Sequence, residues 1–149
     1  MSDETLIMTL STGPVTIRLR PDLAPGHVAR IKELAAEGFY DGVVFHRVIA
    51  GFMAQGGDPT GTGRGGSKKP DLKAEFSAAP HKRGACSMAR SSSPDSANSQ
   101  FFICLADSNF LDRQYTVWGE VVDGMENVDA LPKGEPPRAP GQIVSAKVA

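Results

Sequence analysis

Residues 45–58 read Phe-His-Arg-Val-Ile-Ala-Gly-Phe-Met-Ala-Gln-Gly-Gly-Asp, and this segment says most about both fold and function. It places one permanent cation, Arg47, on a strand-like stretch between large apolar residues. An arginine in apolar surroundings is costly unless it is paired or used. Taken alone, the segment favours a structural ion pair, or an arginine whose charged end reaches water. The aromatic residues, Met53 and Gln55 also describe a groove with an apolar floor and few polar groups, the general form of a small-ligand or peptide site.

A second segment of the same character is Ser-Gln-Phe-Phe-Ile-Cys at residues 99–104. Successive side chains of a strand point to opposite faces of the sheet. Phe101 and Phe102 therefore point in opposite directions. One of them can fill the core while the other lines a surface.

A third segment, residues 110–119, combines an aromatic rim with a buried strand. Phe110, Leu111 and Tyr115 are interpreted as exposed residues that could border a groove. Trp118 lies between Val117 and a glycine in a strand-like stretch, so we expect it in the core.

The rest of the chain contains many short strands and one long helix. Two alternating stretches around the turn at residues 12–14 predict a hairpin. Apolar residues at helical spacing predict a helix that has Pro25 in its first turn and ends at Gly38. A short helix is expected near residues 125–131, stopped by Pro132. Further strands are expected at residues 43–49, 52–55, 85–89, 100–105, 116–122 and 142–148. This pattern is typical of a β-barrel or sandwich rather than a βαβ sheet.

Composition limits the class of protein. The 149 residues are 40% hydrophobic, and no linker or repeat divides them, which predicts one domain over residues 1–149. The formal charge of −1 gives no field that would gather nucleic acid or an anionic membrane. No apolar run approaches the ~20 residues that span a bilayer. The acidic start at residues 1–5 lacks the features of a signal peptide, so a cytoplasmic location is expected. Cys86 and Cys104 are interpreted as buried, reduced thiols.

One glycine-rich motif could indicate dinucleotide binding, but the surrounding sequence argues against it. Residues 61–66 match the dinucleotide fingerprint G-x-G-x-x-G. That fingerprint must follow a strand and open a helix. Here Pro70 follows closely and disfavours a helix start. We therefore interpret residues 56–66 as a mobile surface loop.

The three histidines do not form a recognisable catalytic or metal site. His27, His46 and His81 have no metal-ligand spacing, and we expect no metal and no cofactor. His27 and His81 lie in polar sequence and are expected to be solvated, whereas His46 is expected to be structural. A hydrolase with a Ser-His-Asp triad stays an alternative, although no serine lies in a Gly-x-Ser-x-Gly elbow.

The chain resembles the cyclophilin family along almost its whole length. The run at residues 45–58 is highly specific for that family. Further matches occur in the family's order at Ser87-Met88-Ala89, residues 98–103, Leu111-Asp112 and Val117-Trp118-Gly119. The resemblance implies a closed eight-stranded antiparallel β-barrel capped by one long and one short α-helix. Side chains fill such a barrel, so the site is expected in a groove on its outer wall.

The resemblance also implies a function and a set of residues. It implies a peptidyl-prolyl cis/trans isomerase that assists protein folding, binds proline-containing peptides and unfolded or folding proteins, and is a monomer. A non-catalytic binder or chaperone on the same fold is the main alternative. The implied catalytic residues are Arg47, Phe52, Gln55 and Phe102. The implied substrate-binding residues are Met53, Gly61, Ala89, Arg90, Gln100, Phe110, Leu111 and Tyr115.

Three positions depart from the best-known eukaryotic pattern of the family. Phe110 replaces a familiar tryptophan, which implies cyclosporin binding with reduced affinity. Tyr115 replaces a histidine, a change we expect to be tolerated because both rings pack and both carry a polar edge. Arg90 replaces an asparagine and places a bulky cation beside the peptide channel, where it is expected to shift sequence preference.

Overall fold

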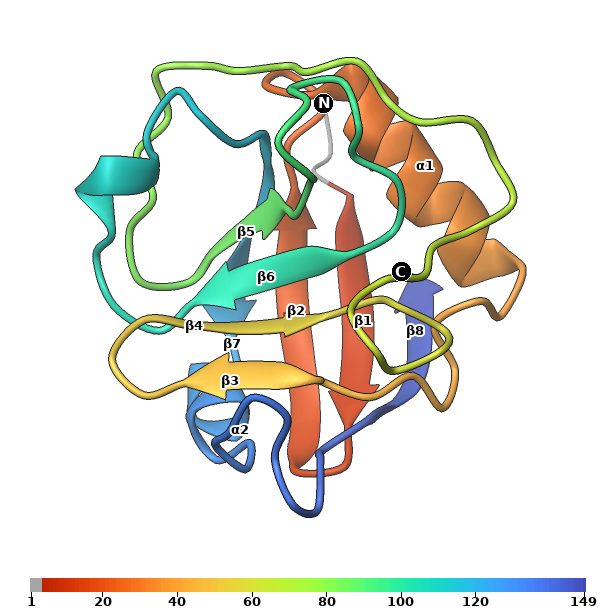
Figure 1. Cartoon of the computed structure of the whole chain (residues 1–149), viewed down its shortest axis with the longest axis vertical. Coiled ribbons are helices and arrows are strands. Elements are labelled where there is room, and N and C mark those ends of the chain that lie inside the picture. Colours follow the sequence, from red (N-terminus) through yellow and green to blue (C-terminus); the bar gives the residue numbers. More distant parts are fainter. Residues whose placement is uncertain (1–3) are drawn as a thin grey trace.

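The strands follow from the alternation of apolar and polar side chains. The computed structural model describes residues 4–149; residues 1–3 of the acidic start lie outside the described part. The predicted hairpin is confirmed as β1 (Thr5–Leu10) and β2 (Gly13–Leu19), in which every second side chain is buried. The remaining strands are β3 (Arg47–Ile49), β4 (Met53–Gly56), β5 (Ala85–Met88), β6 (Phe101–Cys104), β7 (Val117–Asp123) and β8 (Ile143–Val148) (Figure 1).

The eight strands form one antiparallel sheet with the order β3-β4-β6-β5-β7-β2-β1-β8. Figure 1 shows β3, β4 and β6 crossing in front of β1 and β2, so the sheet curls strongly around one core. The edges approach each other through a bridge between Val44 and Gln142 and a hydrogen bond from Phe45 N to Gly141 O at 2.8 Å. Within residues 4–149, β3 and β8 do not themselves pair. The predicted mainly-β, eight-stranded architecture is confirmed, but full closure of the barrel is not.

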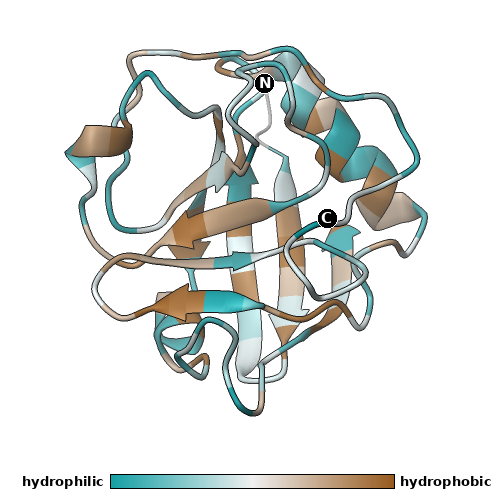
Figure 2. Ribbon diagram, viewed as in Figure 1, coloured by the Kyte–Doolittle hydropathy of each residue, from teal (hydrophilic) through white to brown (hydrophobic). Residues whose placement is uncertain are grey.

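The strand expected at residues 43–49 is shorter than predicted. Only Arg47–Ile49 forms regular strand, and Val44 makes an isolated bridge. Figure 2 shows β3 changing from hydrophilic at its start to hydrophobic at its end. The apolar residues before Arg47 are buried by packing and by pairing with the segment before β8, and not by a continuous ladder.

Helix α1 (Pro25–Ala36) confirms the predicted long helix. Pro25 occupies its first turn, and Gly38 follows its end with a φ of +72°, a conformation that suits glycine. No residue at its start caps it. Instead, Glu75 accepts hydrogen bonds from the backbone N–H groups of Gly26 at 3.2 Å and His27 at 2.8 Å. The carboxylate thereby holds the chain at Glu75 against the start of the helix.

The second helix, α2 (Met125–Asp129), is shorter than its expected range of 125–131, and a 3-10 turn, η1 (Asn109–Leu111), was not predicted. Figure 1 shows α1 and α2 at opposite ends of the curled sheet. In residues 4–149 no helix combines the length and apolar character needed to cross a membrane.

The main core lies inside the curled sheet. Trp118, Phe101 and Phe45 are fully buried, and Phe101 meets each of the other two rings edge to face. Trp118 is therefore a core residue, as predicted. A second, smaller cluster lies on the outer face of the sheet and contains Met53, Ala85, Phe102, Cys104 and Leu111.

Both cysteines are buried and free, as predicted. Cys86 belongs to the main core and Cys104 to the outer cluster, so the two thiols lie on opposite faces of the sheet. Burial raises the pKa of Cys104 to about 12. Burial also raises the pKa of Cys86. Neither thiol is therefore ionised near neutral pH.

Candidate active site on the outer face of the sheet

Strand register places three of the four predicted catalytic side chains in one row, and Phe52 lies just before β4. Arg47 of β3 pairs with Gln55 of β4, and Gln55 pairs with Phe102 of β6. Directly opposed residues on neighbouring strands point to the same face. This row therefore projects outward from the barrel wall. The adjacent row points into the main core and consists of Val48, Ala54 and Ile103.

A cavity of about 140 Å³ opens on this face. It is smaller than the ~300–1,000 Å³ of typical ligand pockets, so it suits one small ring rather than a whole ligand. Its walls combine apolar side chains with the polar groups of Arg47, Gln55 and Arg90. The lining residues are Arg47, Phe52, Met53, Gln55, Ala89, Arg90, Phe102, Leu111 and Tyr115, all of them predicted site residues.

Two of the three remaining predicted residues, Phe110 and Gln100, lie near this cavity. The ring of Phe110 is 65% exposed and stands 5.5 Å from the ring of Phe52, so it forms a rim. Gln100 lines a neighbouring cavity of about 480 Å³. Gly61 lines neither cavity, and the glycines that do so are Gly63, Gly65 and Gly66. The expectation that Leu111 is exposed was wrong, since only 9% of it is accessible and it forms part of the outer cluster.

A chain of hydrogen bonds runs beneath the two cavities. Arg47 donates from Nε to Glu135 Oε1 at 2.8 Å and from Nη1 to Gln55 Oε1 at 3.4 Å. Gln55 Nε2 donates to Gln100 Oε1 at 3.0 Å, and Gln100 Nε2 donates to the carbonyl of Gly63 at 3.0 Å. Among the described residues nothing accepts a hydrogen bond from Arg47 Nη2. This nitrogen is free to donate to a bound molecule.

The glycine loop is organised around one buried carboxylate. Asp58 is fully buried and accepts hydrogen bonds from the backbone N–H groups of Thr60 at 2.8 Å, Thr62 at 3.1 Å and Gly63 at 2.6 Å. Burial by itself raises the pKa of Asp58, but these donors outweigh it and hold the pKa well below 3.8. Asp58 thus fixes the carbonyl groups to which Gln100 donates.

Arg90 supports the groove as well as lining it. Its guanidinium stacks over the ring of Tyr115 at 4.8 Å and faces Phe76 at 5.7 Å. It also donates to the carbonyl of Gln114 from Nε at 3.0 Å and Nη2 at 2.7 Å. Arg90 therefore joins two loops and holds the Tyr115 ring on the cavity wall.

The expectation that His27 and His81 are solvated was wrong, because both are fully buried. His27 pairs through Nδ1 with Glu75 at 2.5 Å. His81 lies behind the cavity, where its ring stacks on Phe102 with centroids 6.1 Å apart. Burial lowers the pKa of both imidazoles. Local sequence could not reveal this, since the acidic partners lie 48 and 31 residues away.

His81 also belongs to an arrangement that resembles a hydrolase triad. Its Nδ1 lies 3.0 Å from Asp112 Oδ1, and its Nε2 lies 3.0 Å from Ser87 Oγ. A nucleophile must reach its substrate. Ser87 and His81 are both fully buried, and Ser87 Oγ donates to the carbonyl of Thr116 at 2.9 Å. The arrangement therefore supports Phe102 from behind and does not form a hydrolytic site.

A metal site is not found in the described part of the chain. No group of three or more His, Cys, Asp or Glu residues there could hold an ion. The acidic and imidazole groups that lie close together are the two pairs His27–Glu75 and His81–Asp112.

Comparison with known proteins gives one consistent result. The family described as cyclophilin type peptidyl-prolyl cis-trans isomerase/CLD matches residues 5–148. A probable peptidyl-prolyl cis-trans isomerase of Brucella suis is 54% identical over 143 residues, covering 89% of this chain and 73% of the relative. A peptidyl-prolyl cis-trans isomerase of Helicobacter pylori is 42% identical over 138 residues, covering 89% and 83%.

Solved structures agree with the sequence relatives. A Cryptosporidium parvum cyclophilin type isomerase superposes with a TM-score of 0.93 at 28% identity, covering 99% of this chain and 98% of that one. A structure of the C. parvum protein in the presence of the dipeptide Ala-Pro gives a TM-score of 0.91 at 30% identity, covering 97% and 98%.

The buried carboxylate of Asp58 predicts a pH-dependent contribution to stability. Its pKa is lower in the folded protein than the ordinary 3.8, so its stabilisation is complete above about pH 5 and is lost as the pH falls toward the folded pKa. We expect Asp58→Asn to lower the free energy of unfolding by about 2 kcal/mol at pH 7. Urea titrations should show this difference shrinking below about pH 4. The exposed Asp41→Asn is the control, and a difference that stays constant with pH would contradict the assignment.

The buried imidazole behind the cavity predicts a local effect on Phe102. His81→Ala should lower the free energy of unfolding by about 2–4 kcal/mol, because it opens a void and removes the imidazole contacts to Asp112 and Ser87. The NMR signals of the Phe102 ring should shift. His27→Ala is the matched control, since it removes an equally buried imidazole that is paired with Glu75. Equal changes at Phe102 in both variants would show that His81 has no special role there.

Proposed function

The chain belongs to the cyclophilin-type peptidyl-prolyl cis-trans isomerases, and we propose that it accelerates rotation of Xaa-Pro bonds by donating a hydrogen bond from Arg47 to the proline nitrogen. One observation carries this proposal: an arginine with a free Nη2 lines a cavity that is sized for a single ring and is bordered by Met53 and Phe102. The same row of the sheet places Gln55 next to Arg47 and Phe102 beyond Gln55.

The reaction needs stabilisation of a twisted amide. Amide resonance creates a rotation barrier of about 18–20 kcal/mol, and uncatalysed exchange at Xaa-Pro bonds takes tens to hundreds of seconds. Twisting removes the resonance and leaves a lone pair on the proline nitrogen. A donor aimed at this nitrogen binds the twisted state more tightly than either planar state, and only such differential binding lowers the barrier. No bond is broken, so the chemistry requires no nucleophile and no proton transfer.

Arg47 meets the requirements for this donor. Its guanidinium stays protonated, and its planar fork can be held through some N–H groups while others face the substrate. Phe52, Met53, Phe102 and Leu111 would grip the proline ring, so that the preceding carbonyl rotates about a fixed proline. The apolar wall excludes water and thereby strengthens the hydrogen bond.

The remaining residues would hold the peptide on either side of the proline. We infer that Ala89 and Gln100 extend the groove and that Arg90 borders it, with proline-containing peptides and unfolded or folding proteins as substrates. The C. parvum structure in the presence of the dipeptide Ala-Pro supports this substrate class. Arg47 and the cavity that it lines favour an enzyme over a protein that binds proline-containing partners without catalysis. A closed barrel, a monomeric state and a cytoplasmic location stay predictions.

The proposed mechanism predicts a selective loss of activity in Arg47→Ala. We expect kcat/KM for a proline peptide to fall about 30- to 1,000-fold, corresponding to about 2–4 kcal/mol of lost transition-state stabilisation. The thermal unfolding temperature should stay close to that of the unchanged protein, because the side chain is partly exposed. A protease-coupled assay measures the rate. Arg138→Ala removes an exposed arginine elsewhere and serves as the control. Near-normal turnover of Arg47→Ala would refute the mechanism.

The exposed rim residue Phe110 predicts the response to cyclosporin. Phe110→Trp adds an indole N–H donor and a larger apolar surface to the rim. We expect cyclosporin affinity to rise about threefold to tenfold, as one added hydrogen bond of about 1 kcal/mol allows. Calorimetric titration of both proteins measures this difference. Affinity for a short proline peptide should change less than about twofold, and equal cyclosporin affinities would contradict the role given to this position.

A further inference from the structure

We propose that Glu135 is a positioning residue for the isomerase reaction, holding the Arg47 guanidinium in the orientation from which Nη2 can donate to the substrate. The proposal rests on the function proposed for Arg47. It concerns a residue outside the set that the sequence indicates, in the loop between α2 and β8.

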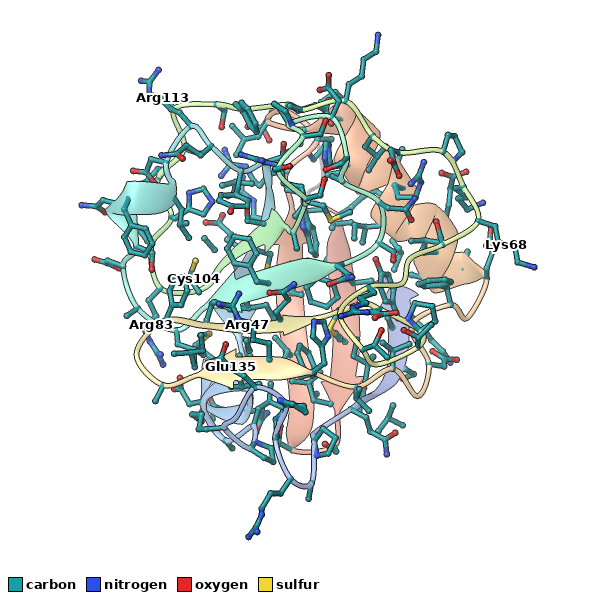
Figure 3. The ribbon with its side chains drawn as sticks, viewed as in Figure 1. Arg47, Lys68, Arg83, Cys104, Arg113 and Glu135 are labelled. Carbon is teal, nitrogen blue, oxygen red and sulfur yellow. The ribbon has the colours of Figure 1, made fainter. Side chains whose placement is uncertain are left out.

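The backbone fixes Glu135 beside Arg47. Val48 follows Arg47 in the chain, and Gly134 precedes Glu135. Val48 and Gly134 form an antiparallel bridge with two reciprocal hydrogen bonds of 2.9 Å. Arg47 and Glu135 are therefore opposed across two paired segments, a position from which side chains meet on the same face. Figure 3 shows the two side chains close together at the edge formed by β3. Arg47 Nε donates to Glu135 Oε1 at 2.8 Å.

Two anchors determine the plane of the guanidinium. Glu135 holds Nε from one neighbouring segment, and Gln55 Oε1 accepts from Nη1 at 3.4 Å from the other. Gln55 is the direct β4 partner of Arg47, so the arginine is flanked on both sides. Because the guanidinium is planar, holding Nε and Nη1 also sets the direction of Nη2. The hydrogen bond to Glu135 is the shorter of the two, and it is charge-assisted.

The exposure of the pair indicates orientation rather than stability as its role. The side chain of Arg47 is 43% exposed and that of Glu135 is 56% exposed. Exposed ion pairs contribute little to folding stability. In contrast, even a small displacement of a catalytic group reduces the reaction rate strongly. Glu135 is also the only acidic residue in residues 132–141, where Lys133 and Arg138 carry the opposite charge.

NMR exchange measurements on a short proline peptide test this proposal. They give the catalysed isomerisation rate, and peptide shifts during titration give Kd. We expect Glu135→Ala to lower the catalysed rate about threefold to tenfold, with Kd changed less than about twofold. Glu135→Gln keeps an oxygen that can accept from Nε and should retain a rate within about twofold of the unchanged protein. Asp123→Ala removes one exposed negative charge elsewhere and is the control for net charge.

Two further readouts separate this role from a structural one. The Nε–H proton signal of Arg47 should move upfield in Glu135→Ala and stay nearly unchanged in Glu135→Gln. In an Arg47→Ala background, Glu135→Ala should have no further effect on the residual rate, because it acts only through the arginine.

The outcomes distinguish this proposal from the one on which it rests. An unchanged rate in Glu135→Ala, or an equal loss in the Arg47→Ala background, would overturn the positioning role while leaving Arg47 as the donor. Normal activity of Arg47→Ala alone would instead overturn the proposed function.

Discussion

The register between β3, β4, β6 and β5 is the constraint on which the site depends. Arg47, Gln55, Phe102 and Ser87 oppose one another in turn across these four strands. A slip of one residue in any pair would turn that strand's outward side chains into the core. The inward row of Val48, Ala54, Ile103 and Cys86 prevents such a slip, because its apolar side chains fill the main core. The packing that stabilises the barrel therefore also sets the order of groups on its outer wall.

A second layer of polar contacts holds that wall in place. Phe102 and Tyr115 meet edge to face at 5.5 Å, and His81 stacks behind Phe102. Asp112 and Arg90 bind this layer to the loops on either side. Each buried polar group of this layer has a hydrogen-bond partner. The layer therefore orients the side chains of the wall without the energetic cost of unpaired polar groups. The Phe102 and Tyr115 side of the cavity is thus supported by these polar contacts as well as by apolar packing.

The sequence predicted those features whose cause is local. Alternation identified the β1–β2 hairpin, helical spacing identified α1, and the motif at residues 45–58 with its distant matches identified nine residues that line one cavity. It could not predict contacts between distant segments. The burial of His81 depends on Asp112, 31 residues away, and the partner of Arg47 lies 88 residues away. The sequence indicated only a mobile surface loop at residues 56–66, because its organising group, Asp58, is satisfied largely by backbone N–H groups, which leave no pattern in the sequence.

The two local interpretations of Arg47 are compatible once its surroundings are known. Composition alone suggests that an arginine among apolar residues forms an ion pair, and Arg47 does pair with Glu135. Yet the pair is too exposed to stabilise the fold appreciably. A guanidinium has five N–H donors, and this ion pair uses only one of them. The contact that neutralises the charge therefore leaves Nη2 available and restricts its direction. In the mechanism proposed for Arg47, which depends on a well-aimed donor, pairing and catalysis would be two consequences of one geometry.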